Sequence, residues 1–382
     1  MSWREFFRRR TRLWAAGGLW AGILLIGFDV YAAIVTYIPQ YKIRNDFRLL
    51  YGTAQTTLHQ GYPHLYDLAA QKSAVEGIGP GIYWSPFLNP PPLVWLVTPL
   101  AVLPFTVAII VWTVLIAGVG ALTWYLVAPG EGLTKLAHGA LWLGLFPVAF
   151  GVMVGQPVAL VAAAVAACWW LAERDRPGLA GLALSLIAVK PQMALLVPLC
   201  LVVAGHARVF AAWLVVSIFM ALIALALLGQ DGLARYRDVL QLASQWDITR
   251  RYAVAGPLGL GPQLYVAQAM ALVGAVAAAW RWRHTGAGVP IAAGITGSLL
   301  FTPYVGFQDF AMLVVAGWLV IRARPSTVQV GLLAVGYVLL ELALLVLAVP
   351  ILVAEVLFLA SMIWPPAPPA GRPSPLPVRA PI

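Results

Sequence analysis

Long apolar runs rich in Leu, Ala and Val fill most of this chain, and its charged residues stand mainly between those runs. Only 10% of the residues are charged, whereas soluble domains have about 25%. About 20 apolar residues suffice to cross a bilayer as a helix, and the runs lack the polar–apolar alternation of an outer-membrane barrel. The pattern therefore predicts an all-α, polytopic transmembrane helical bundle with about 10–12 spans.

The positions of the arginines predict how this bundle is oriented. Basic residues favour the cytoplasmic side of a membrane, and the N-terminus carries five arginines between Arg4 and Arg12. The first apolar run, Leu13 to about Ile38, is too long for a cleavable signal core and is expected to remain as the first span. The formal net charge of +10 thus reflects membrane topology rather than binding to nucleic acid. The segments expected outside are residues 39–85, Lys190-Pro191, the loop of about 230–261, and residues 302–309.

One transmembrane domain is expected over residues 1–364, followed by a Pro-rich, disordered tail over residues 365–382. Between residue 86 and Arg174 the chain has four apolar runs. Four complete crossings would leave Arg174 on the outer side, against the charge rule. One run is therefore predicted to be a half-helix or a re-entrant segment, which is tolerated where protein covers its backbone. The runs lie at about 88–101, 104–127, 136–150 and 155–172.

The first outward segment holds the most polar stretch of the chain, from Tyr41 to Asp67. Apolar residues recur at helical spacing between Phe47 and Leu58, and Asp46 stands where an N-cap would. A second short helix is predicted from about Leu68. Both helices are expected to lie on the membrane surface as amphipathic elements. An acid, bases, tyrosines and histidines gathered where a span leaves the membrane indicate that chemistry takes place there.

Four sequence blocks share an order and spacing over about residues 40–315. They are Asp46 to Leu58 with Gly61 and Leu65-Tyr66-Asp67; Phe87 to Pro91 with Pro99 to Pro104; Gly155-Gln156 with Lys190-Pro191; and Thr302-Pro303-Tyr304 with Asp309. Together they resemble the integral-membrane glycosyltransferases of the GT-C superfamily, and more closely the polyprenol-phosphate-mannose-dependent mannosyltransferases of the glycosyltransferase 87 type. Two positions depart from that pattern: Asn89 stands where Tyr is usual, and Gln308-Asp309 where some members carry histidines.

The resemblance implies a GT-C fold and an enzyme that moves a sugar, with mannose as the first candidate, from a polyprenyl phosphate to an extracytoplasmic glycolipid or glycan. It implies that Asp46 is the general base, with inversion at the sugar. An ordinary Asp has a pKa near 3.9 and is ionised at neutral pH, and a positioned base contributes about 10²–10⁴ in rate. The residues alone are explained equally well by Asp46 as a helix cap, and the two roles are compatible.

Several cations are candidates for holding the lipid phosphate. Lys190 stands between two apolar runs, on the side that usually lacks basic residues. Arg250 and Arg251, in the second outward loop, share this placement, and guanidinium groups bind phosphate in a bidentate manner. The plainer explanations are a lysine that snorkels to the interface and ordinary surface arginines.

Three polar side chains at predicted outward helix ends are candidates for binding sugar hydroxyls: Gln156, Gln308 and Asp309. Helix capping explains the same residues. No metal or other cofactor is expected, because the outward loops contain no Asp-x-Asp pattern and the implied donor carries no nucleotide diphosphate. The implied location is a bacterial cytoplasmic (inner) membrane, with the active site on the extracytoplasmic side.

Asp29 points to a different class of function. It lies inside the first predicted span, where an acid costs about 2.5–3.5 kcal/mol on insertion scales, so it should face the bundle interior and have a partner. Glu341 and Glu355 in the last predicted hairpin are similar. Such residues are typical of an ion-coupled transporter, which is the alternative function. Against it, the sequence shows no inverted repeat with matching broken helices.

Overall fold

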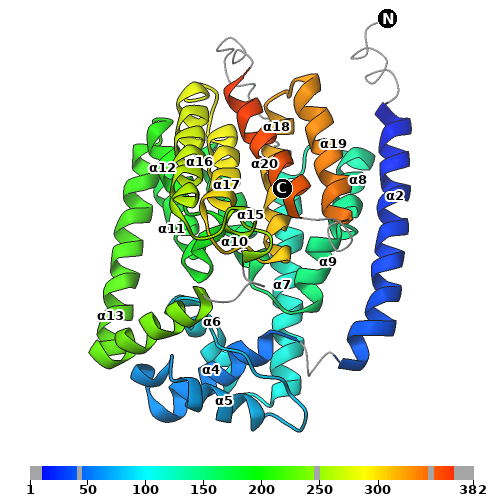
Figure 1. The fold of residues 1–382 in the computed structure, drawn as a ribbon. Helices are drawn as coiled ribbons and strands as arrows, with labels where there is room; N and C mark the ends of the chain where they lie inside the picture. The colour runs from blue at the N-terminus through cyan, green and yellow to red at the C-terminus, as the bar shows by residue number, and fades with distance from the viewer. Residues whose placement is uncertain (1–10, 41–44, 245–249, 343–347, 365–382) are drawn as a thin grey trace, which may run out of the picture.

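The computed structural model describes residues 11–40, 45–244, 250–342 and 348–364. Within these ranges it contains seventeen α-helices and no strand, which confirms an all-α, polytopic bundle (Figure 1). The expected tail and the arginines before position 11 lie outside the described residues. The α-helices are α2 (Thr11–Ala32), α4 (Phe47–Gln60), α5 (Leu68–Glu76), α6 (Pro91–Ala101), α7 (Phe105–Val127), α8 (Gly132–Leu143), α9 (Phe146–Met153), α10 (Val158–Ala172), α11 (Pro177–Ser185), α12 (Val197–Val203), α13 (Ala207–Ser244), α15 (Ala255–Leu258), α16 (Pro262–Arg281), α17 (Gly288–Phe301), α18 (Ala311–Arg322), α19 (Thr327–Glu341) and α20 (Ala348–Ile363).

Four of these elements are long and apolar enough to cross a membrane unaided: α2 with the π-helical turn up to Tyr37, α7, α13 and α16. Helices α8 and α9, bent by 60° at a short break, make a fifth candidate. The other apolar helices have 10–17 residues, so each is shorter than the ~30 Å hydrocarbon core at ~1.5 Å per residue. The protein is thus multi-pass and built largely from short and broken helices, and the count of ten to twelve crossings stays a prediction.

The region between residues 86 and 174 holds the expected irregular segments. Helix α6 has only 11 residues, which is about 16 Å of helix, and the α8–α9 pair is bent. Pro104 precedes α7, and the turn at Gly155-Gln156-Pro157 separates α9 from α10, as predicted. Pro99 lies inside α6 and does not end it.

The first outward segment forms α4 and α5, at the end of the molecule opposite to the start of α2 (Figure 1). Gly61 ends α4 with a φ of 87°. Nine of the fourteen residues of α4 are buried, which is more than a helix lying on a membrane surface would show. Phe47 explains this burial, because its ring stacks between those of Trp112 and Phe105, with centroids 5.3 and 6.3 Å away.

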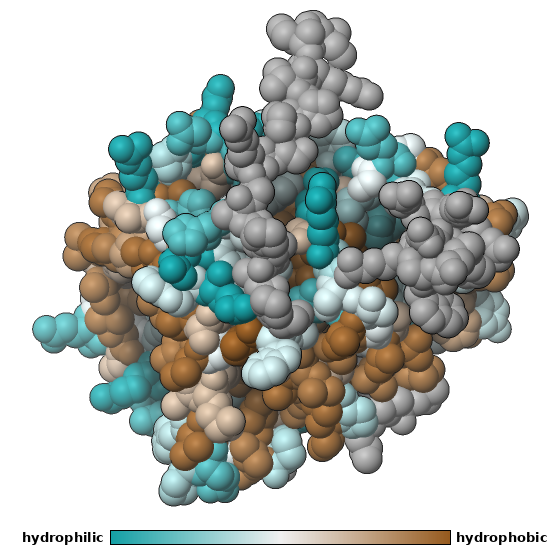
Figure 2. Space-filling view, turned by 90° about the horizontal axis from the view of Figure 1, so that it is seen from above, coloured by the Kyte–Doolittle hydropathy of each residue, from teal (hydrophilic) through white to brown (hydrophobic). Residues whose placement is uncertain are grey.

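Arginine-rich helix ends lie away from this end of the molecule. Helix α10 follows the Gln156 turn and is followed by Arg174, and α18 follows the short 3-10 segment that holds Gln308 and ends at Arg322. Arg322 donates to the carbonyls of Val127 and Ala128 at the end of α7. Figure 2 looks onto the end where α2 starts and shows hydrophilic side chains spread over this end, with hydrophobic ones dominating the lower part of the view. Arg174 and Arg322 therefore lie toward the end of the bundle opposite to the first outward segment (Figure 1), whereas Arg235 contacts that segment through the Pro63 carbonyl.

Asp29 is buried on α2, as expected for an acid that faces the bundle interior. Its Oδ2 has no hydrogen-bond partner in the described part of the chain, and the charged side chain that acts on it is Glu341. Glu341 in turn accepts a hydrogen bond from the Phe146 amide at 2.8 Å. Glu355 is also buried, and its Oε1 has no partner among the described residues. The neighbour found for Asp29 is thus a second acid rather than a base.

Helix α2 packs closely on α8 through a glycine. A Cβ added at Gly22 would lie 2.5 Å from the carbonyl carbon of Ala140, whereas a Cβ added at Gly27 on the same helix meets no atom within 4 Å. A backbone atom cannot rotate away, so the contact requires a glycine at position 22. This approach of the two backbones attaches the first span to the bundle.

We expect Gly22→Ala to destabilise the protein by about 1–3 kcal/mol, as overpacking does, because α2 must move away from α8. Thermal unfolding in detergent measures the effect. Gly27→Ala is the matched control, and it should be neutral or slightly stabilising because Ala favours helix. Equal melting temperatures of the two variants would contradict the close α2–α8 packing.

Candidate active site

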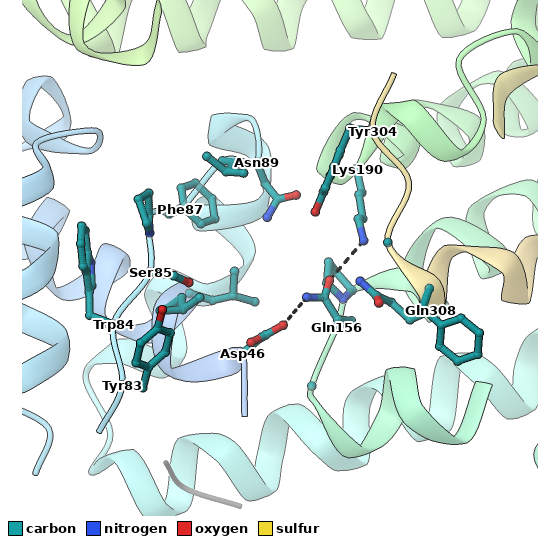
Figure 3. Close-up of a pocket in the computed structure, with 18 of the residues that line it drawn as sticks. Asp46, Tyr83, Trp84, Ser85, Phe87, Asn89, Gln156, Lys190, Tyr304 and Gln308 are labelled. Carbon is teal, nitrogen blue, oxygen red and sulfur yellow. Dashed lines mark hydrogen bonds between the residues drawn. The ribbon is translucent and has the colours of Figure 1, made fainter. Parts of the chain in front are cut away.

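A cavity of about 1110 Å³ lies where the outward segments converge (Figure 3). Its walls come from five parts of the chain that are far apart in sequence. They combine aromatic rings with a few polar side chains, the usual lining of a ligand site. The lining includes Asp46, Lys72, Glu76, the 82–89 segment, Phe150, Gly155, Gln156, Lys190, Leu242, Arg251, Tyr252 and the 304–308 segment.

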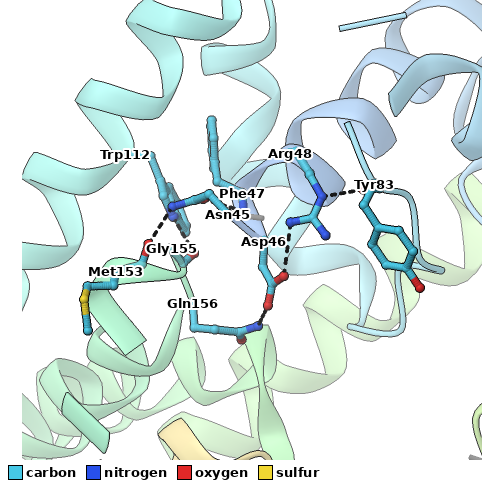
Figure 4. Close-up of polar contacts among 9 residues, drawn as sticks. All are labelled: Asn45, Asp46, Phe47, Arg48, Tyr83, Trp112, Met153, Gly155 and Gln156. Atoms are coloured by element: carbon cyan, nitrogen blue, oxygen red, sulfur yellow. Dashed lines mark hydrogen bonds and ion pairs between the residues drawn. The ribbon is translucent and has the colours of Figure 1, made fainter. Parts of the chain in front are cut away.

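The start of α4 is attached to the turn between α9 and α10 (Figure 4). The Asp46 amide donates to the Val154 carbonyl at 2.6 Å, and the Asn45 side chain donates to the Met153 carbonyl at 3.0 Å. The Trp112 indole donates to the Gly155 carbonyl at 2.8 Å. These bonds satisfy carbonyls that the end of α9 leaves free, and so they fix Asp46 beside Gln156.

Gly155 makes this approach possible. Its φ is 72°, in the left-handed region that favours glycine. A Cβ there would lie 2.4 Å from Oδ1 of Asn45. The geometry therefore requires glycine at position 155, because a side chain there would collide with Asn45. Gln156, which follows it, faces the cavity.

Asp46 does not cap α4, contrary to the plainer explanation of this residue. Its φ and ψ are −69° and −14°, and its side chain makes no capping bond. The cap comes from Asn45, whose Oδ1 accepts from the Phe47 amide at 2.9 Å. The Asp46 carboxylate instead accepts from Nε2 of Gln156 at 2.6 Å and lies 3.4 Å from the Arg48 guanidinium. By contrast, Asp67 does cap a helix, since it accepts from the Ala70 amide at 3.0 Å.

Arg48 joins Asp46 to the far wall of the cavity. Its side chain is buried, and its Nε donates to the Tyr83 carbonyl at 2.5 Å. The same guanidinium lies 5.7 Å from the centre of the Tyr83 ring. Arg48 is not among the candidate residues named from the sequence, although an arginine two residues after a candidate base is a signal that could have identified it.

Lys190 and Asp309 form an ion pair inside the protein. The ammonium lies 2.5 Å from Oδ1 of Asp309, and both side chains are almost fully buried. The other oxygen of Asp309 accepts from the Gly306 amide at 3.0 Å. Lys190 also donates to Oε1 of Gln156 at 3.2 Å. Polar contacts thus connect Asp309, Lys190, Gln156 and Asp46 in one row.

The electrostatic setting suits a base. Burial raises the pKa of Asp46 above its ordinary value, although the hydrogen bond from Gln156 and the positive charges of Arg48 and Lys190 oppose this shift. About a third of the Asp46 side chain is exposed, and it opens into the confined cavity. Burial, with the nearby Asp309 and Asp46, also raises the pKa of Tyr304, so its phenol stays a neutral hydrogen-bond donor.

The cavity contains five of the seven side chains that the sequence singled out: Asp46, Gln156, Lys190, Arg251 and Gln308. Asp309 lies behind Lys190, as its ion-pair partner. Arg250 does not line the cavity. Its carbonyl accepts a hydrogen bond from the Ala253 amide. No cluster of three or more His, Cys, Asp or Glu side chains that could hold a metal ion occurs within the described ranges.

Residues 82–89 form a wall of the cavity that was not predicted from the sequence. Tyr83, Trp84, Ser85 and Asn89 line the cavity, and Figure 3 shows Asn89 and Tyr304 pointing into it from different walls. Two adjacent aromatic residues in an outward loop, Tyr83 and Trp84, were the available signal.

The sequence profile of glycosyltransferase family 87 matches residues 87–307, more than half of the chain. The chain belongs to glycosyltransferase family 87. It is therefore a membrane glycosyltransferase, which confirms the family implied by the four sequence blocks. Comparisons with curated proteins and with solved structures give no match. Of the cavity side chains, Gln156, Lys190 and Tyr304 fall inside the matched range, and Asp46 precedes it.

The bonding around α4 predicts different consequences for two neighbouring residues. Asn45→Ala removes the cap of α4, worth about 0.5–2 kcal/mol, and the bond to Met153, so we expect a lower melting temperature. Asp46→Asn removes no cap, and its amide oxygen can still accept from Arg48 although the charge that faces this buried guanidinium is lost, so we expect a smaller fall in melting temperature. Thermal unfolding of both variants in detergent tests this contrast. A larger loss for Asp46→Asn than for Asn45→Ala would show that Asp46 has the structural role.

Proposed function

We propose that this family 87 glycosyltransferase moves a sugar, with mannose as the first candidate, from a polyprenyl-phosphate donor to an extracytoplasmic glycolipid or glycan, with inversion. The observation that carries the proposal is the carboxylate of Asp46. It opens into the cavity, makes no helix cap, and has a pKa raised by burial. No observation favours the transporter alternative, since its acids Asp29 and Glu355 do not line the cavity.

The proposed reaction is one displacement. The acceptor oxygen attacks the anomeric carbon of the donor sugar, and the bond from that carbon to the phosphate oxygen breaks. The acceptor proton passes to Asp46, and polyprenyl phosphate leaves with the bonding electron pair. A raised pKa makes Asp46 a stronger base than an ordinary Asp while it is ionised.

The leaving phosphate needs hydrogen-bond donors and positive charge. Arg251 lines the cavity, and within the described residues no acidic group pairs with it. The Tyr304 phenol and the Asn89 amide enter from other walls. We therefore assign the phosphate to Arg251, with these donors beside it. A phosphate role for Lys190 or Arg250 stays a prediction, and Gln308 remains a candidate for the sugar hydroxyls.

A second hollow, of about 1010 Å³, suits the apolar chain of a lipid donor. It lies between the end of the first candidate span and helices α7 and α9, and Ile82 borders both this groove and the cavity. Its wall is almost entirely apolar, with Thr106 and Thr113 as exceptions. The groove lining is Ala33, Tyr37, Ile38, Pro39, Ile78, Gly79, Pro80, Ile82, Phe105, Thr106, Thr113, Val152 and Met153. We propose that the polyprenyl chain lies here, with its phosphate in the cavity.

The proposed location is a bacterial cytoplasmic membrane with the cavity on the extracytoplasmic side. The support is the polarity of the bundle, because α10 and α18 follow the cavity-lining residues Pro157 and Gln308 and lead to Arg174 and Arg322. Arginine-rich ends favour the cytoplasm.

Asp46→Asn should lower transfer from a polyprenyl-phosphate sugar by about 10²-fold or more, since a positioned base contributes about 10²–10⁴. In the wild type, kcat/KM should fall as pH drops through the raised pKa of Asp46, at a higher pH than the ordinary value near 3.9. The assay compares equal amounts of folded protein. Asp67→Asn, which alters a capping Asp outside the cavity, is the control and should stay within about twofold. Turnover retained in Asp46→Asn would refute the assignment of the base.

Thr113→Trp should fill the groove and raise KM for a long-chain donor by about tenfold, the effect of losing roughly 1.4 kcal/mol of binding. A donor with a short chain, which does not reach the groove, should be affected much less. Val114→Trp changes the next residue of α7, which is exposed and outside the groove, and it should leave both values unchanged. An equal effect of the two tryptophans would exclude the groove as the chain site.

A further inference from the structure

Three side chains, each from a different break in the helical bundle, stand in a row behind the candidate base. Asp309 lies in the turn before α18, Lys190 between two short 3-10 segments, and Gln156 between α9 and α10. The contacts are 2.5 Å from Asp309 to Lys190, 3.2 Å from Lys190 to Gln156, and 2.6 Å from Gln156 to Asp46. The row ends at the carboxylate that faces the cavity (Figure 3).

The chemistry of these groups permits only one orientation of the Gln156 amide. An ammonium has donors and no acceptor, so Lys190 must face the amide oxygen. The amide N–H₂ then points at Asp46, which is an acceptor when ionised. In the flipped orientation the amide N–H₂ would face the ammonium, and the amide oxygen would face the carboxylate.

Asp309 keeps Lys190 available for this task. A buried ammonium without a partner is costly and tends to lose its proton. The carboxylate of Asp309 is held in turn by the Gly306 amide. The charge of Lys190 is therefore balanced inside the protein, whereas a group that binds a lipid phosphate needs charge to spare.

We propose that Lys190 and Asp309 are positioning residues, which orient the Gln156 amide so that it holds the Asp46 carboxylate ready to accept the proton of the acceptor hydroxyl. This inference rests on the proposed function of Asp46. It differs from donor binding by Lys190 in one respect that can be measured. A positioning residue acts on kcat and on the pH profile through Gln156, whereas a phosphate ligand acts on the KM for the donor.

The test compares three variants. Lys190→Met with Asp309→Asn, the Met–Asn pair, deletes the ion pair without leaving a buried unpaired charge. Lys190→Gln with Asp309→Asn, the Gln–Asn pair, is equally uncharged, but its new amide can donate to Gln156. Gln156→Leu removes the residue on which the others act. Thermal unfolding in detergent selects the variants that are folded.

We expect the Met–Asn pair and Gln156→Leu each to lower kcat by about tenfold or more, as for a lost hydrogen bond to a charged group, with the donor KM within about twofold. Adding Gln156→Leu to the Met–Asn pair should cause no further loss, because the effects run through one residue. The Gln–Asn pair should recover part of the rate. Losses that multiply, or a donor KM that rises about tenfold in both pairs, would overturn the proposal.

The pH profile gives a second readout that a merely structural role would not change. Gln156 and Lys190 both lower the pKa of Asp46, so their removal should raise it, and the acid limb of kcat/KM should move to higher pH. An unmoved limb in Gln156→Leu would refute the proposal. The other charged or titratable groups that face Asp46 or the cavity are Arg48, Lys72, Glu76, Tyr83, Arg251, Tyr252, Tyr304 and, behind Lys190, Asp309, and these variants change only Asp309 among them.

The outcomes separate this proposal from the proposed function. An active wild type whose Asp46→Asn variant is equally active defeats the assignment of the base, and the row then has nothing to position. If the wild type is active and needs Asp46, but the losses caused by the Met–Asn pair and by Gln156→Leu multiply, only the positioning role is refuted. If the Met–Asn variant does not accumulate as folded protein, the Gln–Asn variant is the test. A donor KM within about twofold of the wild-type value supports the proposal, and a tenfold rise opposes it.

Discussion

Backbone groups that leave a helix need partners, and inside an apolar bundle only the protein can supply them. This constraint explains where the site lies. The end of α9 frees the carbonyls of Met153, Val154 and Gly155, and they accept from Asn45, the Asp46 amide and Trp112. The same bonds that make the broken helix tolerable therefore hold the candidate base in place. A straight, continuous helix at this point would have neither the polar turn nor the contact with α4.

Charge inside the bundle follows a similar rule, since a buried ion needs a partner. Lys190 has Asp309, and Arg48 lies beside Asp46. The two pairs differ in what they leave free. In the first, both side chains are almost fully buried and their charges balance each other, whereas the Asp46 carboxylate is about a third exposed and opens into the cavity. Burial without complete pairing explains why the pKa of Asp46 is raised rather than lowered, and this is the property that a base for a hydroxyl proton requires.

Membership of glycosyltransferase family 87 fixes the class of reaction, and the geometry suggests how this chain carries it out. A cavity and an apolar groove meet at Ile82, a plan that suits a donor with a polar head and a long lipid chain. The intramembrane acids Asp29, Glu341 and Glu355 take no part in either hollow. Asp29 lies on α2, which packs on α8, and Glu341 lies on α19, which packs on α9. At the bend between α8 and α9, Glu341 accepts a hydrogen bond from the Phe146 amide.

The sequence alone determined the fold class, the polarity of the bundle and most members of the site. Apolar runs leave the chain no alternative to helices in a membrane, arginines such as Arg174 and Arg322 follow the helices that lead away from the site, and polar residues beside glycine or proline, such as Gln156 and Lys190, mark the breaks. Tertiary structure decided the roles. Asp46 sits at the start of a helix, where capping is the usual task, and only the position of Asn45 frees its carboxylate. Lys190 looked like a free cation, and only the approach of Asp309, 119 residues later, neutralises it. Partners so distant in sequence leave no local pattern, because they meet only when the broken helices pack.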